Sequence, residues 1–142
     1  MRKPIEERIL FEDNHLLIVN KLPSEIVQGD KTGDVCLLDD VKSYIKETYN
    51  KPGEAFVGLV HRLDRPTGGA MVFAKTSKGA SRLSEQMKAG EFDKTYYAVV
   101  CGRPREQKGK IVSYLKKDEK TNTVQIVPQT TRNAKRAELD YE

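Results

Sequence analysis

The segment from Gly58 to Gly69 holds the side chains best suited to chemistry. Asp64 lies between Arg62 and Arg65, and Pro66 and a pair of glycines follow it closely. A carboxylate beside cations stays ionised at neutral pH, as a nucleophile or an electrostatic stabiliser requires. The alternative is an ordinary loop aspartate that caps the turn at the proline. The residue types alone leave both interpretations open.

Other kinds of catalytic site receive little support from the sequence. His61 and Asp64 could form part of a metal site, but no third ligand accompanies them, and His15 stands alone in a predicted strand. We therefore expect no metal. No serine has the surroundings of a nucleophile elbow, which argues against a Ser-His-Asp triad.

Two adjacent tyrosines lie on a predicted strand from Thr95 to Val100. Successive side chains of a strand point to opposite faces, so one of Tyr96 and Tyr97 is expected to pack in the core while the other can reach a site. Spacing alone favours a packing role for either one.

The elements that position these residues follow from hydrophobic periodicity and turn residues. Amphipathic helices are predicted at residues 37–49 and 77–89, the second with Ser77 as its N-cap and Gly90 as its C-terminal stop. Strands are predicted at residues 9–11, 15–21, 55–60, 70–74, 95–100, 111–115 and 123–127, with a further strand beginning near residue 134. This order predicts an α+β fold with a mixed, mostly antiparallel sheet and flanking helices.

The length of 142 residues leaves room for one domain with one core. The longest apolar runs are far shorter than the roughly 20 residues that cross a bilayer, so no membrane span is predicted. The N-terminus lacks the apolar region of a secretory signal, and we expect a cytoplasmic protein. Cys36 and Cys101 have no metal-ligand spacing and are expected to be buried small hydrophobic residues rather than a disulfide.

Charge is distributed unevenly along the chain. Residues 1–60 hold 8 Lys or Arg against 11 Asp or Glu, whereas residues 61–142 hold 17 against 10. The basic half is the half expected to contact phosphate, although a solvated surface with a chance imbalance is the other interpretation.

The sequence resembles the RluA-type RNA pseudouridine synthases. Residues 61–69, His-Arg-Leu-Asp-Arg-Pro-Thr-Gly-Gly, are similar to the family signature H-R-L-D-x-x-T-S-G. Residues 12–21 resemble the opening hairpin of the family, residues 73–76 its following strand, and residues 94–102 its K-x-Y-x-A-x-V-x-G strand. The likeness covers most of the chain in the right order.

The resemblance implies a pseudouridine synthase fold and an enzyme that isomerises uridine in rRNA or tRNA stem-loops without a cofactor. Asp64 is then the catalytic carboxylate, and Tyr96 matches the active-site tyrosine that packs against the uracil. His61, Arg62 and Thr67 are assigned to substrate binding, with Arg62 helping to open the RNA. The target uridine has to be flipped out, because a stacked base hides the glycosidic bond.

The sequence departs from the family pattern in two places. Gly68 stands where the family usually has serine, and the later motif of the G-R-x-H-Q-I-R kind has no counterpart before Glu142. We therefore expect the N-terminal portion of a catalytic domain, without an S4-like domain and without the usual basic partner of Asp64. An open sheet edge would then allow self-association.

Two alternatives from other classes remain. The first is a catalytically incomplete fragment that acts only as an RNA-binding module, which the basic second half favours. The second is a carboxylate glycosidase, for which the sequence offers no second acid.

Overall fold

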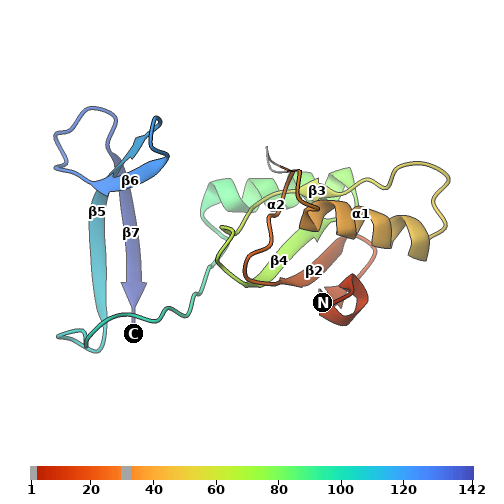
Figure 1. The fold of residues 1–142 in the computed structure, drawn as a ribbon, viewed down its shortest axis with the longest axis horizontal. Helices are drawn as coiled ribbons and strands as arrows, with labels where there is room; N and C mark the ends of the chain where they lie inside the picture. The colour runs from red at the N-terminus through yellow and green to blue at the C-terminus, as the bar shows by residue number, and fades with distance from the viewer. Residues whose placement is uncertain (1–2, 30–32) are drawn as a thin grey trace. The chain divides into compact units, whose positions relative to one another are not determined.

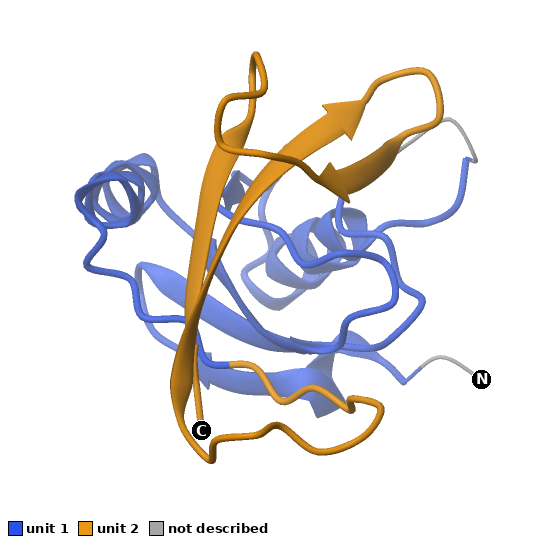
Figure 2. Ribbon diagram, turned by 90° about the vertical axis from the view of Figure 1, so that its left-hand side faces the viewer, with its two compact units in different colours: residues 1–95 blue, residues 96–142 orange. Residues whose placement is uncertain are grey.

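The computed structural model describes residues 3–29 and 33–142, and the chain forms two compact units, residues 1–95 and residues 96–142. Figures 1 and 2 show the elements and the two units. The first unit contains a four-stranded sheet with two α-helices, and the second contains a three-stranded sheet. The α+β prediction is confirmed, and every strand pair in the described residues is antiparallel.

The sheet of the first unit has the order β1-β2-β4-β3. Its strands are β1 (Ile9–Glu12), β2 (Leu16–Lys21), β3 (Gly58–Leu59) and β4 (Gly69–Ala74), and a short 3-10 helix, η1 (Ile5–Arg8), precedes them. The predicted opening hairpin is confirmed. Its turn is closed by Asp13, whose Oδ1 accepts hydrogen bonds from the backbone N–H groups of His15 and Leu16, both at 2.7 Å.

The two helices pack on opposite faces of this sheet. One face joins Leu17, Val19, Met71 and Phe73 to the buried residues of α1 (Leu37–Thr48), and the other joins Val72 and Ala74 to Leu83 of α2 (Ser77–Ala89). Alternate residues of β2 and β4 therefore pack against different helices, because successive side chains of a strand point to opposite faces of the sheet. Both central strands are apolar on both faces for this reason.

Both helices match their predicted positions, but the N-cap of α2 was assigned wrongly. Thr76, rather than Ser77, is the N-cap, and its Oγ1 accepts a hydrogen bond from the Gly79 N–H at 3.1 Å. Gly90 ends the helix with φ of 75°, a left-handed conformation that glycine adopts without strain.

The second unit is a sheet of order β6-β5-β7, formed by β5 (Gly109–Asp118), β6 (Thr123–Ile126) and β7 (Lys135–Tyr141). The strands predicted at residues 111–115 and 123–127 are confirmed as parts of β5 and β6, which pair as an antiparallel hairpin. Cross-strand pairing places Ile111 opposite Leu139 and Leu115 opposite Ile126. These four apolar side chains lie on one face of the sheet, while the other face carries the ion pairs of Lys110 and Arg136 with Glu138.

Two strand predictions were wrong. The predicted strand at residues 55–60 is reduced to Gly58–Leu59, and residues 95–100 form no strand. Tyr96 is 59% exposed and Tyr97 is 103% exposed, so neither tyrosine packs in a core. The β-propensity of a residue depends largely on packing against neighbouring strands. Residues 95–100 form no strand pair with any of the described residues, so their β-propensity does not produce a strand.

The cysteine prediction holds for one residue of two. Cys36 is buried and Cys101 is exposed, and both are free thiols. Within the described part of the chain, no helix is long and apolar enough to cross a membrane.

Candidate active site

Asp64 lies on the turn that connects β3 to β4. The backbone N–H of Thr67 donates to the carbonyl oxygen of Asp64 at 3.0 Å, which closes this turn. Leu63 packs against the apolar core, whereas Asp64 is exposed. The side chain of Leu63 thus anchors the turn to the core, and the side chain of Asp64 points to solvent.

A buried lysine binds the backbone of this turn. Lys21, at the end of β2, is 0% exposed. Its Nζ atom donates to the carbonyl oxygens of Leu22, Asp64 and Arg65, each at 3.2 Å, and to that of Thr67 at 2.6 Å. Four carbonyl oxygens converge on one ammonium group, so the turn is fixed through its main chain and the Asp64 carboxylate is not used for this purpose.

Burial lowers the pKa of Lys21, while the nearby charges of Glu25 and Asp64 raise it again. An ammonium group needs hydrogen-bond acceptors and opposite charge to remain protonated away from water. In the sequence, Lys21 stands at the end of the opening hairpin and no motif assigns it a role. A lysine that follows an apolar run often indicates only the end of a strand.

The glycines after Asp64 allow the turn to pack closely. A Cβ atom at Gly68 would lie 3.0 Å from Cδ of Pro23 and 3.1 Å from the carbonyl oxygen of Lys21. Gly69, the first residue of β4, has φ of 134°, which side chains rarely tolerate. Both glycines therefore have a structural reason, and the absence of the serine usual in the family at position 68 matches the close approach of Pro23.

His61 makes a structural contact at the start of the same connection. Its Nε2 accepts a hydrogen bond from the Val72 N–H at 3.0 Å, and its ring lies 5.7 Å from that of Phe92, centroid to centroid. Burial lowers the pKa of His61, and the charge of Lys94 lowers it further. A neutral imidazole is required here because only an unprotonated Nε2 can accept that hydrogen bond.

The two arginines beside Asp64 differ in their surroundings. Arg62 is exposed. Arg65 places Nη2 3.0 Å from Oδ2 of Asp34, and its Nε donates to the carbonyl oxygen of Ser24 at 3.2 Å. The guanidinium group of Arg65 is therefore directed to Asp34 and the neighbouring segment.

Four of the five residues assigned from the sequence lie within one compact unit. His61, Arg62, Asp64 and Thr67 share one connection in the first unit. Tyr96 belongs to the second unit, so neither unit by itself contains both Asp64 and Tyr96.

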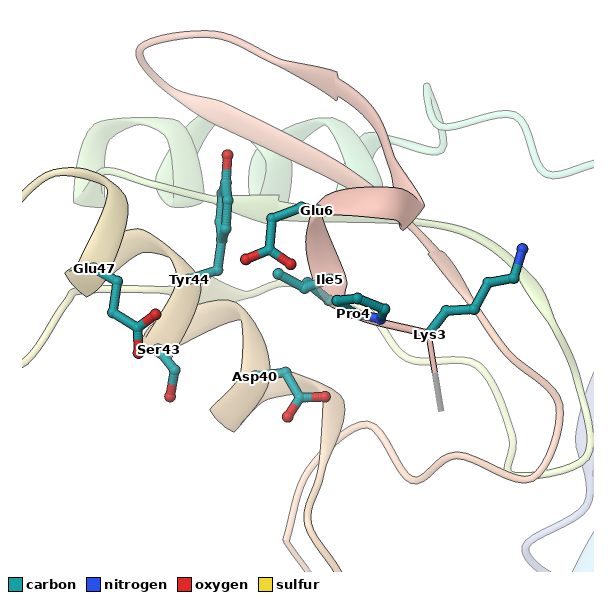
Figure 3. A pocket seen from close by; sticks show the side chains of 8 residues that line it. All are labelled: Lys3, Pro4, Ile5, Glu6, Asp40, Ser43, Tyr44 and Glu47. Carbon is teal, nitrogen blue, oxygen red and sulfur yellow. The ribbon is translucent and has the colours of Figure 1, made fainter. Parts of the chain in front are cut away.

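A pocket of about 280 Å³ lies elsewhere in the first unit, between residues 3–6 and helix α1 (Figure 3). Its lining includes the carboxylates of Glu6, Asp40 and Glu47 and one ammonium group, that of Lys3. An acidic lining disfavours phosphate, so we do not place an RNA site here. Among the described residues, no group of three His, Cys, Asp or Glu side chains could hold a metal ion.

Comparison with known proteins identifies the family. Residues 15–142 match the family described as RNA pseudouridylate synthase. An uncharacterized RNA pseudouridine synthase of Bacillus subtilis, YhcT, is 38% identical over 111 residues, which cover 78% of this chain and 36% of the relative. Ribosomal large subunit pseudouridine synthase D of Pseudomonas aeruginosa is 35% identical over 104 residues, which cover 72% of this chain and 31% of the relative.

Solved structures show the same fold. The human RNA pseudouridylate synthase domain containing 4 superimposes with a TM-score of 0.76 at 24% identity, over 94% of this chain and 52% of that one. The chain therefore belongs to the RNA pseudouridine synthase family and is of the RluA type, as the signature around Asp64 predicted. It spans about a third of the length of the curated relatives that it matches.

Proposed function

We propose that the protein isomerises uridine to pseudouridine in ribosomal or transfer RNA and that Asp64 is its catalytic carboxylate. Family membership supports the reaction class, and the names of relatives such as synthase D specify the large ribosomal subunit. The observation that carries the assignment is the exposed Asp64 on a turn whose backbone is fixed by buried Lys21. A rigid backbone under a free carboxylate is what a positioned catalytic group requires.

The reaction conserves every atom of the nucleotide. The bond between N1 of uracil and C1′ of ribose breaks, the freed base turns, and a bond from C5 to C1′ forms. The proton on C5 is lost and a proton is taken up at N1, so no oxidant, reductant or cofactor is consumed. Asp64 assists the cleavage of the glycosidic bond, and Tyr96 is proposed to lie against the uracil and take the C5 proton.

Access to the uridine requires that it leave the base stack, since a duplex hides both C1′ and C5 from a side chain. Arg62 is exposed and is the side chain proposed to fill the space of the flipped base. Thr67 and His61 flank the turn and are proposed to contact the substrate. Lys and Arg side chains from the basic half of the chain would hold phosphates, a contribution that weakens as salt concentration rises.

The test is an Asp64→Asn substitution assayed for conversion of uridine in total RNA. We expect conversion to fall by about 1,000-fold or more, because an amide cannot act as the nucleophile or carry the charge, while RNA affinity is unchanged. Asp93→Asn, at an exposed acidic residue of the same unit, is the matched control and should retain full conversion. Undiminished turnover by Asp64→Asn would overturn the assignment.

The second candidate is an RNA-binding module without turnover. It is favoured by the basic half of the chain, because residues 61–142 hold 17 Lys or Arg against 10 Asp or Glu. The assay therefore includes the 142-residue chain and a chimera in which the C-terminal part of the Bacillus subtilis relative follows Glu142. Conversion by either form excludes the second candidate. RNA binding that weakens with salt, with no conversion by either form, supports it.

A further inference from the structure

The segment from Leu22 to Glu25 supports the Asp64 turn. The Ser24 N–H donates to the carbonyl oxygen of Arg65 at 2.8 Å, and the Arg65 Nε donates back to the Ser24 carbonyl oxygen. Ser24 has φ of 72°, a conformation that costs a non-glycine residue free energy and persists only where its surroundings hold it. Something must therefore fix this segment in place.

Glu25 provides that fixation through both of its carboxylate oxygens. Oε2 accepts a hydrogen bond from the Leu22 N–H at 2.8 Å, and Oε1 lies 2.6 Å from Nη1 of Arg8. The side chains of Arg8 and Glu25 are 2% and 8% exposed, so the pair is buried. Helix η1 is thereby tied to the first residue of the supporting segment.

The carboxylate of Glu25 also interacts electrostatically with Lys21, whose ammonium group binds the backbone of the turn. The charge of Glu25 raises the pKa of this buried lysine. Glu25 thus supplies part of the negative charge that keeps Lys21 protonated, in addition to its direct contact with the segment.

Stability alone does not account for the Arg8–Glu25 pair. The Nε and Nη2 atoms of Arg8 are buried without a hydrogen-bond acceptor in the described structure, and Nη2 lies 3.9 Å from Oδ2 of Asp40. Removing charges from water is costly, and apolar residues of similar volume often replace buried ion pairs without loss of stability. A buried ion pair whose donors are not all hydrogen-bonded therefore stabilises a core less than apolar side chains of the same volume would.

We infer that Glu25, held by Arg8, is a positioning residue for Asp64. The pair fixes the Leu22 end of the supporting segment, the segment fixes the Arg65 carbonyl through Ser24, and the Asp64 turn is held at both that carbonyl and Lys21. The inference rests on the proposed catalytic role of Asp64 for its effect on turnover, but the mechanical coupling is independent of that role.

The coupling is tested first, by amide hydrogen exchange on the 142-residue chain. The double variant Arg8→Met with Glu25→Leu replaces the ion pair by apolar side chains. We expect exchange of the Ser24 and Thr67 amides to accelerate by about tenfold or more, while the Ala80 amide of α2, bonded to the Thr76 carbonyl, is unchanged. Unchanged exchange at Ser24 and Thr67 would overturn the inference.

Turnover is tested next, in the form of the protein that converts uridine. The double variant should lower kcat by roughly 10- to 100-fold with little change in KM. Arg8→Lys keeps the buried ion pair with Glu25 and should retain most of the rate.

The matched control is a second, largely buried ion pair among the described residues of the first unit, Glu12 with Lys75. It lies at the opposite end of the β2–β4 ladder, because Leu16 pairs with Ala74 there while Lys21 pairs with Gly69. The variant Glu12→Leu with Lys75→Met should keep kcat. An equal loss of kcat in both double variants would show a general structural effect and overturn the positioning role. Absence of conversion by the unsubstituted protein would instead contradict the proposed function and leave the exchange result to decide the coupling.

Discussion

The Nζ atom of Lys21 lies 3.2 Å from the carbonyl oxygen of Asp64, 43 residues later in the chain. The contact is to the main chain, so it fixes where Asp64 sits without neutralising its carboxylate. A lysine buried in this way leaves the carboxylate available for a substrate and makes the rest of the turn dependent on the lysine.

Replacing Lys21 by methionine should therefore destabilise the first unit. The methionine fills a similar volume but donates no hydrogen bond, and the carbonyl oxygens of Asp64, Arg65 and Thr67 lose a shared donor. We expect the free energy of unfolding to fall by about 2–4 kcal/mol, since each buried unpaired polar group costs about 1–3 kcal/mol and water entry recovers part of that. Urea unfolding measures it. Lys46→Met, at an exposed position of α1, should be neutral, and an equal loss there would contradict the explanation.

Introducing the family's serine at position 68 should also be unfavourable here, because Pro23 occupies the space. We expect Gly68→Ser to cost about 1–2 kcal/mol of unfolding free energy. Pro23→Ala should relieve part of this cost, so a double-mutant cycle measured by urea unfolding should show coupling. Gly53→Ser is the control, since a Cβ there meets nothing within 4 Å. Additive effects at positions 23 and 68 would show that the contact is unimportant.

The sequence predicted an element correctly where its apolar periodicity and its terminating residues agreed. Helix α2 was predicted with its observed bounds, because its apolar period and Gly90 both point to the same ends. The strand at residues 95–100 was not obtained, because a strand also needs a partner, and β-propensity carries no information about one. The cap of α2 was misplaced by one residue for a related reason, since Thr76 and Ser77 have equally suitable hydroxyl groups.

The sequence suggested which residues could do chemistry but not what supports them. Asp64 is assigned through the family resemblance, the family itself is confirmed, and the catalytic role of Asp64 stays a prediction. Lys21 contacts the backbone of Asp64 43 residues later, and Glu25 pairs with Arg8 17 residues earlier. Contacts of this kind leave no pattern in residue type along the sequence. Only the folded chain shows that the lysine at the end of β2 and the turn before β4 meet, through the pairing of Lys21 with Gly69.

The ion pair of Glu12 and Lys75 should contribute to stability and to its acid dependence. Lys75 Nζ lies 2.5 Å from Oε1 of Glu12 and 4.4 Å from the centre of the Tyr49 ring. Although burial on its own would raise it, the pKa of Glu12 is lowered by hydrogen bonds from Lys75, Tyr49 and Tyr44. The stabilisation is therefore present above pH 4.5, the ordinary value for glutamate, and is lost as pH falls through the lower folded-state pKa.

Lys75→Met should lower the free energy of unfolding by about 2–3 kcal/mol at neutral pH and flatten its decline in acid. Urea unfolding at neutral pH and between about pH 5 and pH 3 measures both effects. Lys108→Met, which breaks the exposed pair with Glu142, should change neither. An undiminished acid dependence in Lys75→Met would show that Glu12 is not the group responsible.

His61 should make the first unit less stable as the solution becomes mildly acidic. Its folded-state pKa lies below the ordinary value of 6.5, so the unfolded chain binds more protons once pH falls below 6.5. Protonation also removes the acceptor for the Val72 N–H. Unfolding free energy should therefore decline between about pH 7 and pH 5, and His61→Gln, which keeps an acceptor but does not titrate, should reduce that slope. His15→Gln, at the other histidine and exposed, is expected to retain it. If His61→Gln left the pH dependence of the unfolding free energy unchanged, the hydrogen bond from the Val72 N–H to a neutral His61 would not explain that dependence.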